Sequence, residues 1–447
     1  MKPILDAVAI ILTHKDSVFA IKRQNFLKAF PGYWAFPGGK VDEADKVGTL
    51  PAFFKKHPRH LMNALIRESH EELGIDLIEL AEKKAVVDIF FLGLAITPDF
   101  NPYRFATYFF KVELKTRPKM KVDENEAFFA DWMSGKELLD VYRSGRMLAV
   151  PPVLKTYSRL AENIKLQEIK DLDFTYDDAT EVPMIESING LKQLMPLSNT
   201  LPPANRTNCF VIGDKGEKVF AVDPSPKDED EYKKLVNTIK NLQITDIFIT
   251  HHHIDHCQYA DQLARDLNCP ISLSQYTHDK LLKRPGYFKD VKVRIVKEGD
   301  VVTKWLGKIV KVFEIPGHDE GQLALAPESQ EWFIAGDLFQ GAGTVVVGGE
   351  EGDMIKYFNT LRRVIQLNPQ VLFPSHGIGL GGVEIMKKTL EHRLMREEQV
   401  KELYLQGHSE DKILSTIYFE TPSKLLPYAL ENIRSHLKKL KIENKLS

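Results

Sequence analysis

The 447-residue sequence has little of several features that would assign its class at once. It contains three cysteines, too few for a disulfide scaffold, and this scarcity indicates a reducing compartment. Its longest apolar run, Ile89–Ile96, is far shorter than the roughly 18 residues that a transmembrane helix needs. Lysine and arginine total 60 against 62 aspartates and glutamates. The resulting net charge of −2 excludes a strongly basic nucleic-acid coat and an acidic tail.

The residues that are present indicate a folded chain of more than one domain. Hydrophobic residues make up 43% and charged residues 27%, which is too apolar for general disorder. At about 150 residues per domain, the length suggests roughly three domains. The apolar N-terminal run follows Asp6 and precedes no small-residue cleavage site, so we interpret it as a strand and expect a cytoplasmic protein. The 14 histidines are unevenly spread.

Residues 1–166 have the pattern of one α+β unit. Apolar stretches at 8–12 and 18–21 flank a polar turn and predict a hairpin. Apolar residues at helical spacing predict a helix over about 59–73, which Gly74 ends. The other elements expected in this unit are strands near 85–96 and 105–114 and a helix near 152–166.

Two further segments follow an acidic stretch, residues 167–183, which has little periodicity and is expected to be a linker. A second unit over 184–385 contains short apolar strands that each end at a polar residue. Loops at strand ends converge while the sheet holds them rigid, so these residues are well placed for chemistry. The charged helical stretch 386–447 is expected to pack on the second unit. The expected strands lie at 219–223, 246–250, 311–318, 332–337 and 371–376.

Histidines gather directly after the strand expected at 246–250, where residues 251–256 read His-His-His-Ile-Asp-His. Four of these ligand-type side chains, those of His251, His253, Asp255 and His256, can face two metal ions from such a tight turn. Imidazole nitrogens and carboxylate oxygens suit zinc, with manganese and iron as alternatives. A surface histidine run would not explain why later strands also end at ligand-type residues. Those later residues are His318, Asp337 and His376.

This constellation resembles the metallo-β-lactamase superfamily, whose His-x-His-x-Asp-His motif is followed by separate His, Asp and His positions. The resemblance covers roughly residues 184–390 and implies an αββα sandwich with two metal ions. It implies that Asp337 bridges the ions and that Asp223 orients ligands. His252 occupies a position that is not a ligand in this family. The implied ligands are His251, His253 and His318 for one ion, and Asp255, His256 and His376 for the other.

The same resemblance implies a mechanism. Two close cations lower the pKa of a bridging water from 15.7 toward about 7, so hydroxide is available at neutral pH to attack a thioester or phosphodiester. Asp255 would also orient this nucleophile. Gln258 and Tyr259 stand where the family commonly has two glycines, a departure that affects the loop shape and not the ligand set.

Weaker features point to a subgroup of that superfamily. Residues 207–213, Thr-Asn-Cys-Phe-Val-Ile-Gly, resemble the opening strand of the lactamase-B-like subgroup, and 386–447 resembles its small winged-helix-like module. The subgroup includes single-stranded-RNA endoribonucleases and thioesterases. Some basic residues could steer an anionic substrate, although a solvated helix face is the simpler interpretation. They are Arg393, Arg396, Lys438, Lys439, Lys441 and Lys445.

A second cluster consists of carboxylates. Glu68, Glu71 and Glu72 are spaced i, i+3 and i+4 on the expected helix and share one face. Because three carboxylates without lysine partners repel one another, a divalent cation would compensate them, and oxygen-only ligands indicate magnesium or manganese. Taken alone, the cluster is more simply a solvated acidic helix face.

Residues 33–40 read Tyr-Trp-Ala-Phe-Pro-Gly-Gly-Lys, and with the carboxylate helix they resemble the Nudix box. The resemblance implies that residues 1–166 form a Nudix domain, which cleaves a diphosphate bound to a second moiety. Magnesium or manganese would sit on the three glutamates. Arg67 would orient these glutamates, the Gly39 carbonyl would add a ligand, and Glu126 would be a downstream acid.

Two departures from the Nudix box concern its first acid. Asp45 replaces the box's first glutamate, and residues 46–66 separate it from Arg67 where the usual spacing is much shorter. This insertion, with the stretches 104–110 and 151–154, resembles the peroxisomal coenzyme A diphosphatase subgroup. Since the glutamate helix is intact, we favour a working active site over a degenerate binding module.

One other motif is a decoy. Gly377–Gly382 has the spacing of a dinucleotide-binding loop, but it begins directly after His376 and lacks the required strand–helix–strand context. The sequence has no Walker phosphate loop, serine elbow or Cys-x-x-Cys motif.

The sequence therefore predicts a bifunctional metallohydrolase. Its α+β Nudix domain precedes an αββα metallo-β-lactamase sandwich and a small C-terminal winged-helix-like helical module. The expected cofactors are two Zn²⁺ (or Mn²⁺ or Fe²⁺) in the lactamase-fold site, and Mg²⁺ or Mn²⁺ in the Nudix site. Three hypotheses about the substrates remain open at this point.

In the first hypothesis, both sites act on small molecules such as coenzyme A thioesters. In the second, both act on RNA, with an endoribonuclease in the lactamase fold. In the third, the Nudix module only senses nucleotides. The near-zero charge favours a small-molecule diphosphate or thioester. Single-stranded RNA and a second copy of the chain remain open as partners, and no membrane is expected.

Overall fold

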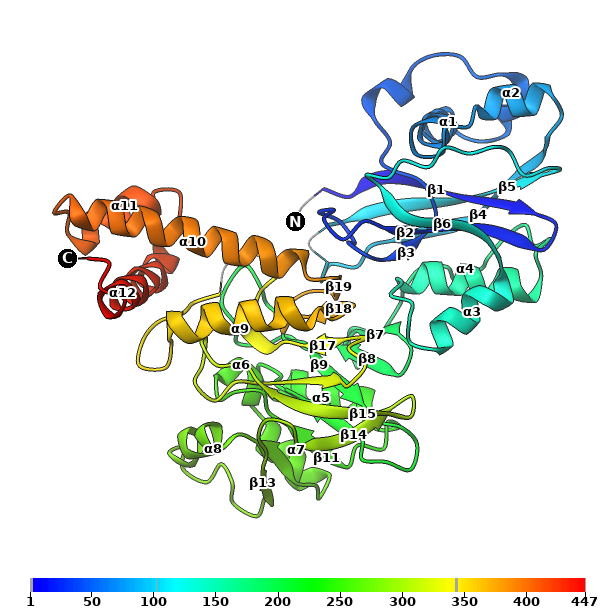
Figure 1. Cartoon of the computed structure of the whole chain (residues 1–447). Coiled ribbons are helices and arrows are strands. Elements are labelled where there is room, and N and C mark those ends of the chain that lie inside the picture. The colour runs from blue at the N-terminus through cyan, green and yellow to red at the C-terminus, as the bar shows by residue number, and fades with distance from the viewer. Residues whose placement is uncertain (1–2, 102, 342–344, 447) are drawn as a thin grey trace. The chain divides into compact units, whose positions relative to one another are not determined.

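The computed structural model describes residues 3–101, 103–341 and 345–446, and the chain divides into two compact units (Figure 1). The first unit comprises residues 1–176 and 185–189, and the second comprises 177–184 and 190–447. Among the described residues, no helix combines the length and apolar character needed to cross a membrane.

One sheet with the strand order β3-β2-β1-β5-β4, and with β6 beside β2, forms the centre of the first unit. The predicted hairpin is confirmed, because β1 and β2 pair antiparallel with Thr13 opposite Val18. The strands are β1 (Leu5–His14), β2 (Ser17–Arg23), β3 (Trp34–Ala35), β4 (Val86–Ile96), β5 (Phe105–Leu114) and β6 (Ala127–Ser134).

Helices cover both faces of this sheet, because β1 alternates its apolar side chains between them. Val8 and Ile10 pack with α1 (Arg59–Leu73), which lies on the same face as α2 (Leu77–Glu82), whereas Ile11 packs on the opposite face (Figure 1). That opposite face is covered by α3 (Gly135–Arg143) and α4 (Pro151–Glu162).

The predicted helix over 59–73 is confirmed and ends at Gly74, whose φ of 64° is left-handed. The helix expected near 152–166 is α4, which stops at Glu162. Two short 3₁₀ helices, Glu43–Lys46 and Ala52–Lys56, lie before α1.

Part of the acidic stretch after α4 is packed rather than exposed. Ile169 and Leu172 are buried in the core of the first unit, and the Ile169 amide donates to the Leu92 carbonyl at 2.7 Å. The short strand β7 (Met184–Ile188) follows, and its Ser187 carbonyl accepts from the Ala149 amide at 3.0 Å.

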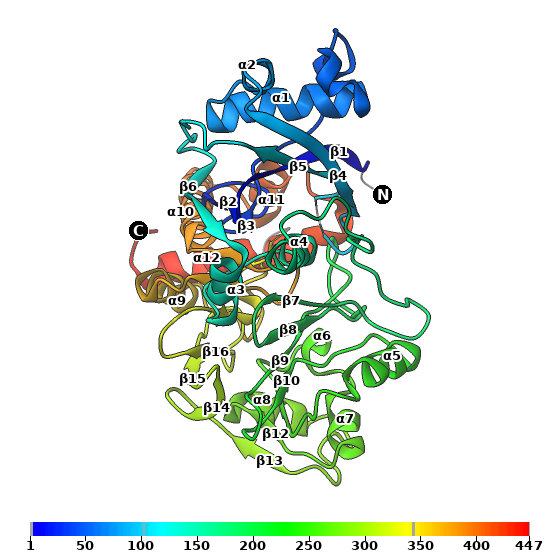
Figure 2. The same cartoon turned by 90° about the vertical axis from the view of Figure 1, so that its right-hand side faces the viewer.

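The second unit contains two sheets, whose strands are labelled in Figures 1 and 2. The first has the order β13-β12-β11-β10-β9-β8, and the second has the order β14-β15-β16-β17-β18-β19. The strands of the first sheet are β8 (Leu191–Leu194), β9 (Cys209–Ile212), β10 (Phe220–Val222), β11 (Asp246–Phe248), β12 (Ile271–Leu273) and β13 (Val293–Ile295). Those of the second are β14 (Val301–Trp305), β15 (Lys308–Glu314), β16 (Leu323–Pro327), β17 (Phe333–Ile334), β18 (Val371–Phe373) and β19 (Leu380–Gly381).

The two sheets pack face to face with helices outside, which confirms the αββα sandwich. Phe210 of β9 meets Phe373 of β18 with ring centroids 5.5 Å apart. Apolar residues of α5 and α7 pack on the first sheet, and those of α9 and α10 pack on the second. The helices are α5 (Glu229–Ile239), α6 (Ile254–Cys257), α7 (Ala260–Asp266), α8 (Gln275–Leu282), α9 (Met354–Leu367) and α10 (Glu384–Leu405).

All five strands expected in this unit are present, and their ends carry the predicted polar residues. β10 ends just before Asp223, and β11, which runs parallel to it, ends just before the histidine turn. β17 and β18 are likewise parallel and lead to Asp337 and His376. Since carboxyl ends of parallel strands share one edge, the topology gathers these residues.

The C-terminal stretch forms α10, α11 (Glu410–Ile417) and α12 (Leu426–Ile442). Two of its cations belong neither to a solvated helix face, as the sequence favoured, nor to a steering surface. Arg393 is 1% exposed and donates to the Asn432 side chain, and Lys439 is buried and pairs with Glu397 at 2.7 Å.

Candidate metal centres

All seven residues predicted as ligands in the second unit lie together at the strand ends. Three overlapping groups have their ligand atoms within 4.8 Å of one another. The groups share His251 and His256, so they form one continuous cluster. They consist of His251, His253 and His318; of His251, His256 and Asp337; and of Asp255, His256 and His376.

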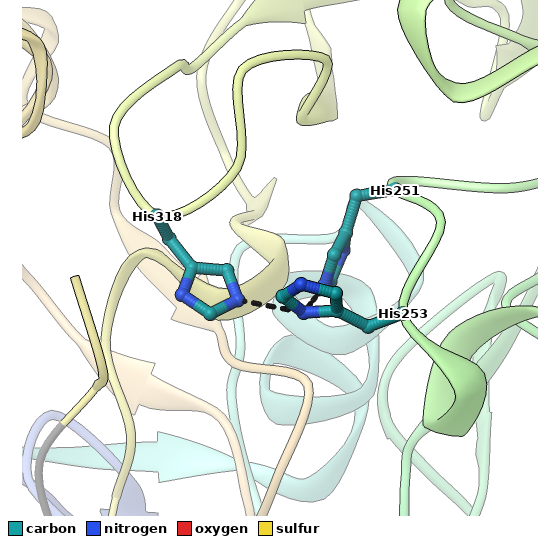
Figure 3. A group of neighbouring side chains, drawn as sticks. All are labelled: His251, His253 and His318. Carbon is teal, nitrogen blue, oxygen red and sulfur yellow. Dashed lines mark hydrogen bonds between the residues drawn. The ribbon is translucent and has the colours of Figure 1, made fainter. Parts of the chain in front are cut away.

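Three histidines form the first half of this cluster, as Figure 3 shows. The Nδ1 atom of His253 lies 3.0 Å from Nε2 of His251 and 3.0 Å from Nε2 of His318. His251 and His253 come from the turn after β11, and His318 comes from the loop after β15. Three ring nitrogens therefore converge on one point from two loops.

Asp255, His256 and His376 form the second half, and Asp337 faces both halves. The Nε2 atoms of His256 and His376 lie 3.8 and 3.6 Å from Oδ2 of Asp255. One oxygen of Asp337, Oδ1, lies 3.6 and 3.5 Å from these same nitrogens. Its other oxygen, Oδ2, lies 3.7 Å from Nε2 of His318.

Each of the five histidine rings has one nitrogen that faces away from the cluster, which we call the outer nitrogen. This nitrogen lies within hydrogen-bond distance of an acceptor. Carbonyls and carboxylates only accept hydrogen bonds, so the outer nitrogen carries the proton and the inner one presents a lone pair. The outer nitrogen of His318 donates to the Val346 carbonyl (2.6 Å), and that of His376 donates to the Arg206 carbonyl (2.8 Å). The outer nitrogen of His253 donates to Glu351 (3.2 Å), and that of His256 donates to Asp223 (2.8 Å). The outer nitrogen of His251 donates to the Thr250 hydroxyl (3.0 Å).

Asp223 is buried and accepts three hydrogen bonds. Its Oδ1 accepts from the Thr250 amide at 2.7 Å, and its Oδ2 accepts from the Thr250 hydroxyl at 2.6 Å and from His256 at 2.8 Å. Because the Thr250 hydroxyl gives its proton to Asp223, it is free to accept from His251. One carboxylate thus fixes the orientation of two rings.

The electrostatics of the cluster fit a divalent cation. Oδ1 of Asp337 and Nε2 of His256 are buried without a hydrogen-bond partner, an arrangement that is costly unless a cation satisfies it. Burial, with the neighbouring His256, lowers the pKa of His251 well below its ordinary value. Burial alone would raise the pKa of Asp337, but His376 and His256 hold it well below its usual range. Nitrogen and carboxylate donors of this kind suit zinc.

His252, expected not to be a ligand, points to different partners. Its Nδ1 lies 2.8 Å from Oδ2 of Asp319, and its Nε2 lies 3.1 Å from Oε1 of Glu351. Burial lowers the pKa of His252, yet these carboxylates outweigh it and raise that pKa to about 9. Lys280 also contacts Glu351, at 2.9 Å. No pattern in the sequence marks Glu351, whereas Asp319 directly follows His318 and could have been noticed.

The glutamates of the first unit lie against its glycine-rich loop. The Gly38 amide donates to Oε2 of Glu72 at 2.9 Å, and a Cβ at Gly39 would overlap the Glu68 carboxylate. Glu68 and Glu72 are buried, whereas the side chain of Glu71 is 56% exposed. A side chain at position 39 would displace the Glu68 carboxylate.

Arg67 ties these acids together. It reaches Asp45 through two nitrogens, with Nε 3.2 Å from Oδ1 and Nη2 2.9 Å from Oδ2. Its Nη1 donates to Glu68 at 2.7 Å and to Glu71 at 2.9 Å. The Asn63 side chain donates to the Asp45 carbonyl at 2.8 Å. Asp45 therefore lies beside α1 even though a long insertion separates it from Arg67 in the sequence.

Buried like charges make the carboxylate site suitable for a cation. Burial raises the pKa of Glu68, and burial with the charges of Glu68 and Glu126 raises the pKa of Glu72 to about 8. Oε2 of Glu126 lies 3.6 Å from Arg23. The Gly39 carbonyl accepts from the Val8 amide at 2.8 Å. Oxygen-only donors of this kind suit magnesium or manganese.

Comparison with family models matches three parts of the chain. Residues 3–149 match the NUDIX domain, and residues 202–376 match the metallo-beta-lactamase superfamily. Residues 409–447 match the beta-lactamase associated winged helix domain.

Three curated relatives are similar to part of this chain. The beta-lactamase-like protein 2 homolog of Drosophila melanogaster is 27% identical over 255 residues, which are 54% of this chain and 84% of that protein. A hydroxyacylglutathione hydrolase of Bdellovibrio bacteriovorus is 30% identical, over 36% of this chain and 60% of that protein. An atrochrysone carboxyl ACP thioesterase of Aspergillus fumigatus is 23% identical, over 46% and 62%. The chain therefore carries a Nudix domain, a metallo-β-lactamase domain and a winged-helix domain, and it is a metal-dependent hydrolase.

Proposed function

We propose that the second unit hydrolyses the thioester of an acylated small-molecule thiol and that the first unit cleaves a coenzyme A-like diphosphate. The observation that carries the first part is the set of five histidines, each held through its outer nitrogen with its inner nitrogen facing the cluster. Such orientation is what a metal centre requires of its ligands before the ion arrives.

The ligand assignment follows the two halves of the cluster. One zinc-like ion would be held by the first three histidines, the other by Asp255, His256 and His376, and Asp337 would give one oxygen to each. When bound, such ions supply an activated water and polarise the attacked carbonyl. The chain's own contribution is to fix the rings, and Asp255 at the edge of the cluster would orient the attacking water.

The choice of a thioester over a phosphodiester has two supports. Arg393 and Lys439 are buried and paired, so two of the cations that could have guided RNA are not available to it. One relative is named as a thioesterase and another as a hydrolase of hydroxyacylglutathione.

The three cysteines are free and buried, and on that basis we place the protein in the reducing cytoplasm.

The Nudix assignment rests on the buried glutamates. Glu68, Glu71 and Glu72 would hold magnesium or manganese, which neutralises the diphosphate when bound. Arg67 holds Glu68 and Glu71 in place while Asp45 holds Arg67. The Gly39 carbonyl and Glu126 would complete the site.

A substrate panel on the full chain tests both assignments. Acyl-coenzyme A, acylglutathione, coenzyme A, ADP-ribose, NADH and capped RNA are offered to wild type, to the double variant His251→Ala, His253→Ala, and to Glu72→Gln. We expect the double variant to lose thioesterase activity alone and Glu72→Gln to lose diphosphatase activity alone. RNA cleavage without thioester cleavage would replace the proposal with an endoribonuclease. A wild-type Nudix site that binds nucleotides without cleaving them would make that domain a sensor.

A further inference from the structure

We propose that the C-terminal helical module positions two histidines of the metal centre through one loop, residues 345–353, which we call the brace loop. This inference rests on the proposed metal site. All groups involved belong to the second unit.

One side of the brace loop contacts the histidine cluster. The Val346 carbonyl accepts from Nδ1 of His318 at 2.6 Å, and Oε2 of Glu351 lies 3.2 Å from Nε2 of His253. His253 and His318 are two of the three rings in the first half of the cluster. The loop therefore sets the rotation of both rings, while Thr250 holds the third.

Glu351 is itself held in place. Lys280 donates to its Oε1 at 2.9 Å, and His252 lies 3.1 Å from the same oxygen. The carboxylate has a side-chain exposure of 24%, so these contacts are only partly screened by water. Glu351 thus has a defined position from which to hold His253.

The other side of the brace loop contacts α12 and α10. The Val347 amide donates to Oδ1 of Asn432 at 2.9 Å, and the Gly349 amide donates to Oε2 of Glu431 at 2.9 Å. Arg393 of α10 donates to the Val345 carbonyl. The module thus contacts residues 345, 347 and 349, while the carbonyl of residue 346 contacts His318.

Asn432 is the centre of this second set of contacts. It is 5% exposed, its Oδ1 also accepts from Arg393 at 3.0 Å, and its Nδ2 donates to the Tyr428 carbonyl at 3.2 Å. A Cβ at Gly348 would lie 2.6 Å from the Glu431 Cβ, so the loop backbone lies directly against α12. The Asp353 amide closes the loop onto the Gly317 carbonyl at 2.8 Å, beside His318.

A continuous chain of contacts therefore links α12 to two ring nitrogens of the proposed metal site. Asn432, Arg393 and Glu351 act as positioning residues, because their contacts are to the loop or to a ligand histidine. Loss of the partner that orients a ligand typically lowers metal affinity by about 10–100-fold. The C-terminal module thus helps to orient two histidines of the proposed metal centre.

The test compares Asn432→Leu with Asn432→Asp in the full chain. Leucine removes the acceptor for Val347 and Arg393, whereas aspartate retains an oxygen at that place. Zinc affinity is measured by competition with a chelator, and the visible spectrum of the cobalt-loaded protein reports ligand geometry. We expect at least about tenfold weaker zinc binding and an altered spectrum for Asn432→Leu, and recovery of both for Asn432→Asp.

Two further variants separate positioning from stability. Glu351→Ala removes the acceptor of His253 without touching the module, and it should also weaken zinc binding by about tenfold or more, even if Asn432→Leu does not fold. Glu397→Gln is the matched control, because Glu397 pairs with Lys439 (2.7 Å) and His436 (3.2 Å) inside the module. It should lower the melting temperature and leave zinc affinity and the cobalt spectrum unchanged.

Two results would overturn the inference in distinguishable ways. If wild type binds two ions and either a folded Asn432→Leu or Glu351→Ala binds them equally tightly, the module does not position the ligands through the brace loop. If wild type binds no metal, the proposed function fails and the inference fails with it.

Discussion

Replacing Asp223 with asparagine should misplace one proton in the metal centre. The asparagine oxygen can still accept from the Thr250 amide, as Oδ1 does now at 2.7 Å. Its NH₂ group then stands where Oδ2 accepts from His256 Nδ1 at 2.8 Å. Two donors would face each other, so His256 is driven to carry its proton on Nε2, the nitrogen that faces Asp255 and Asp337.

The size of this effect follows from the number of contacts changed. A protonated Nε2 has no lone pair for a metal, and loss of such an orienting partner costs about 10–100-fold in metal affinity. At tenfold per 1.4 kcal/mol, that corresponds to about 1.4–2.8 kcal/mol. In the metal-free protein, the Thr250 hydroxyl loses the acceptor to which it donates at 2.6 Å, and the loss of this buried hydrogen bond should lower the free energy of unfolding by about 1–3 kcal/mol.

The assay measures zinc affinity by chelator competition and metal-free stability by urea unfolding, for wild type, Asp223→Asn and Asp246→Asn. Asp246 is also buried, but it pairs with Arg294 at 2.5 Å and touches no residue of the cluster. We expect the control to lose stability without losing zinc affinity. Zinc binding by Asp223→Asn at wild-type affinity would refute the assignment of the proton on His256.

Three other predictions concern the Nudix site and the C-terminal module. Glu72→Gln should abolish diphosphatase activity, measured by phosphate release, and leave thioesterase activity unchanged; equal loss of both would show that the sites are coupled. Arg67→Lys cannot keep both contacts to Asp45, so diphosphatase activity should fall by about tenfold, a loss of about 1.4 kcal/mol in transition-state stabilisation. Burial lowers the pKa of His436 below 6.5. Burial would raise the pKa of Glu397, but His436 and Lys439 bring it below 4.5. The unfolded chain thus binds more protons than the folded one, and the free energy of unfolding should fall as pH drops below about 6.5, and further below about 4.5. His436→Gln should remove the part near pH 6 in urea titrations, and an unchanged profile would contradict this origin.

The metal-ligand cluster was the most predictable part of the molecule. His251, His253 and Asp255 stand within one short stretch, and each remaining candidate follows an apolar strand, so spacing and strand ends sufficed to collect them. Such a pattern can be recognised in a single sequence because the ligand atoms belong to side chains of a few chemical types.

The groups that orient these residues could not be found in the same way. Val346 and Arg206 act through backbone carbonyls, which every residue possesses, so no residue type marks them. Glu351 lies 98 positions from His253, in a loop without periodicity. These partners come together only in the tertiary structure.

The charge of a side chain was the poorest guide to whether that side chain is buried or exposed. Arg393 and Lys439 look like members of a basic surface in the sequence, yet Asn432 and Glu397 allow them to be buried. Asp45 is a contrasting case. The sequence identified Asp45 only as the replacement for the first glutamate of the Nudix box, and its two-point contact with Arg67 depends on the path of the insertion.

The most direct test of the account is the metal content of the purified full chain, measured by inductively coupled plasma mass spectrometry after dialysis. Wild type should retain about two zinc-like ions per chain, as expected for a dinuclear site. The double variant His251→Ala, His253→Ala should lose them while keeping its diphosphatase activity. Wild type without bound metal, or a double variant that retains both ions, would contradict the account.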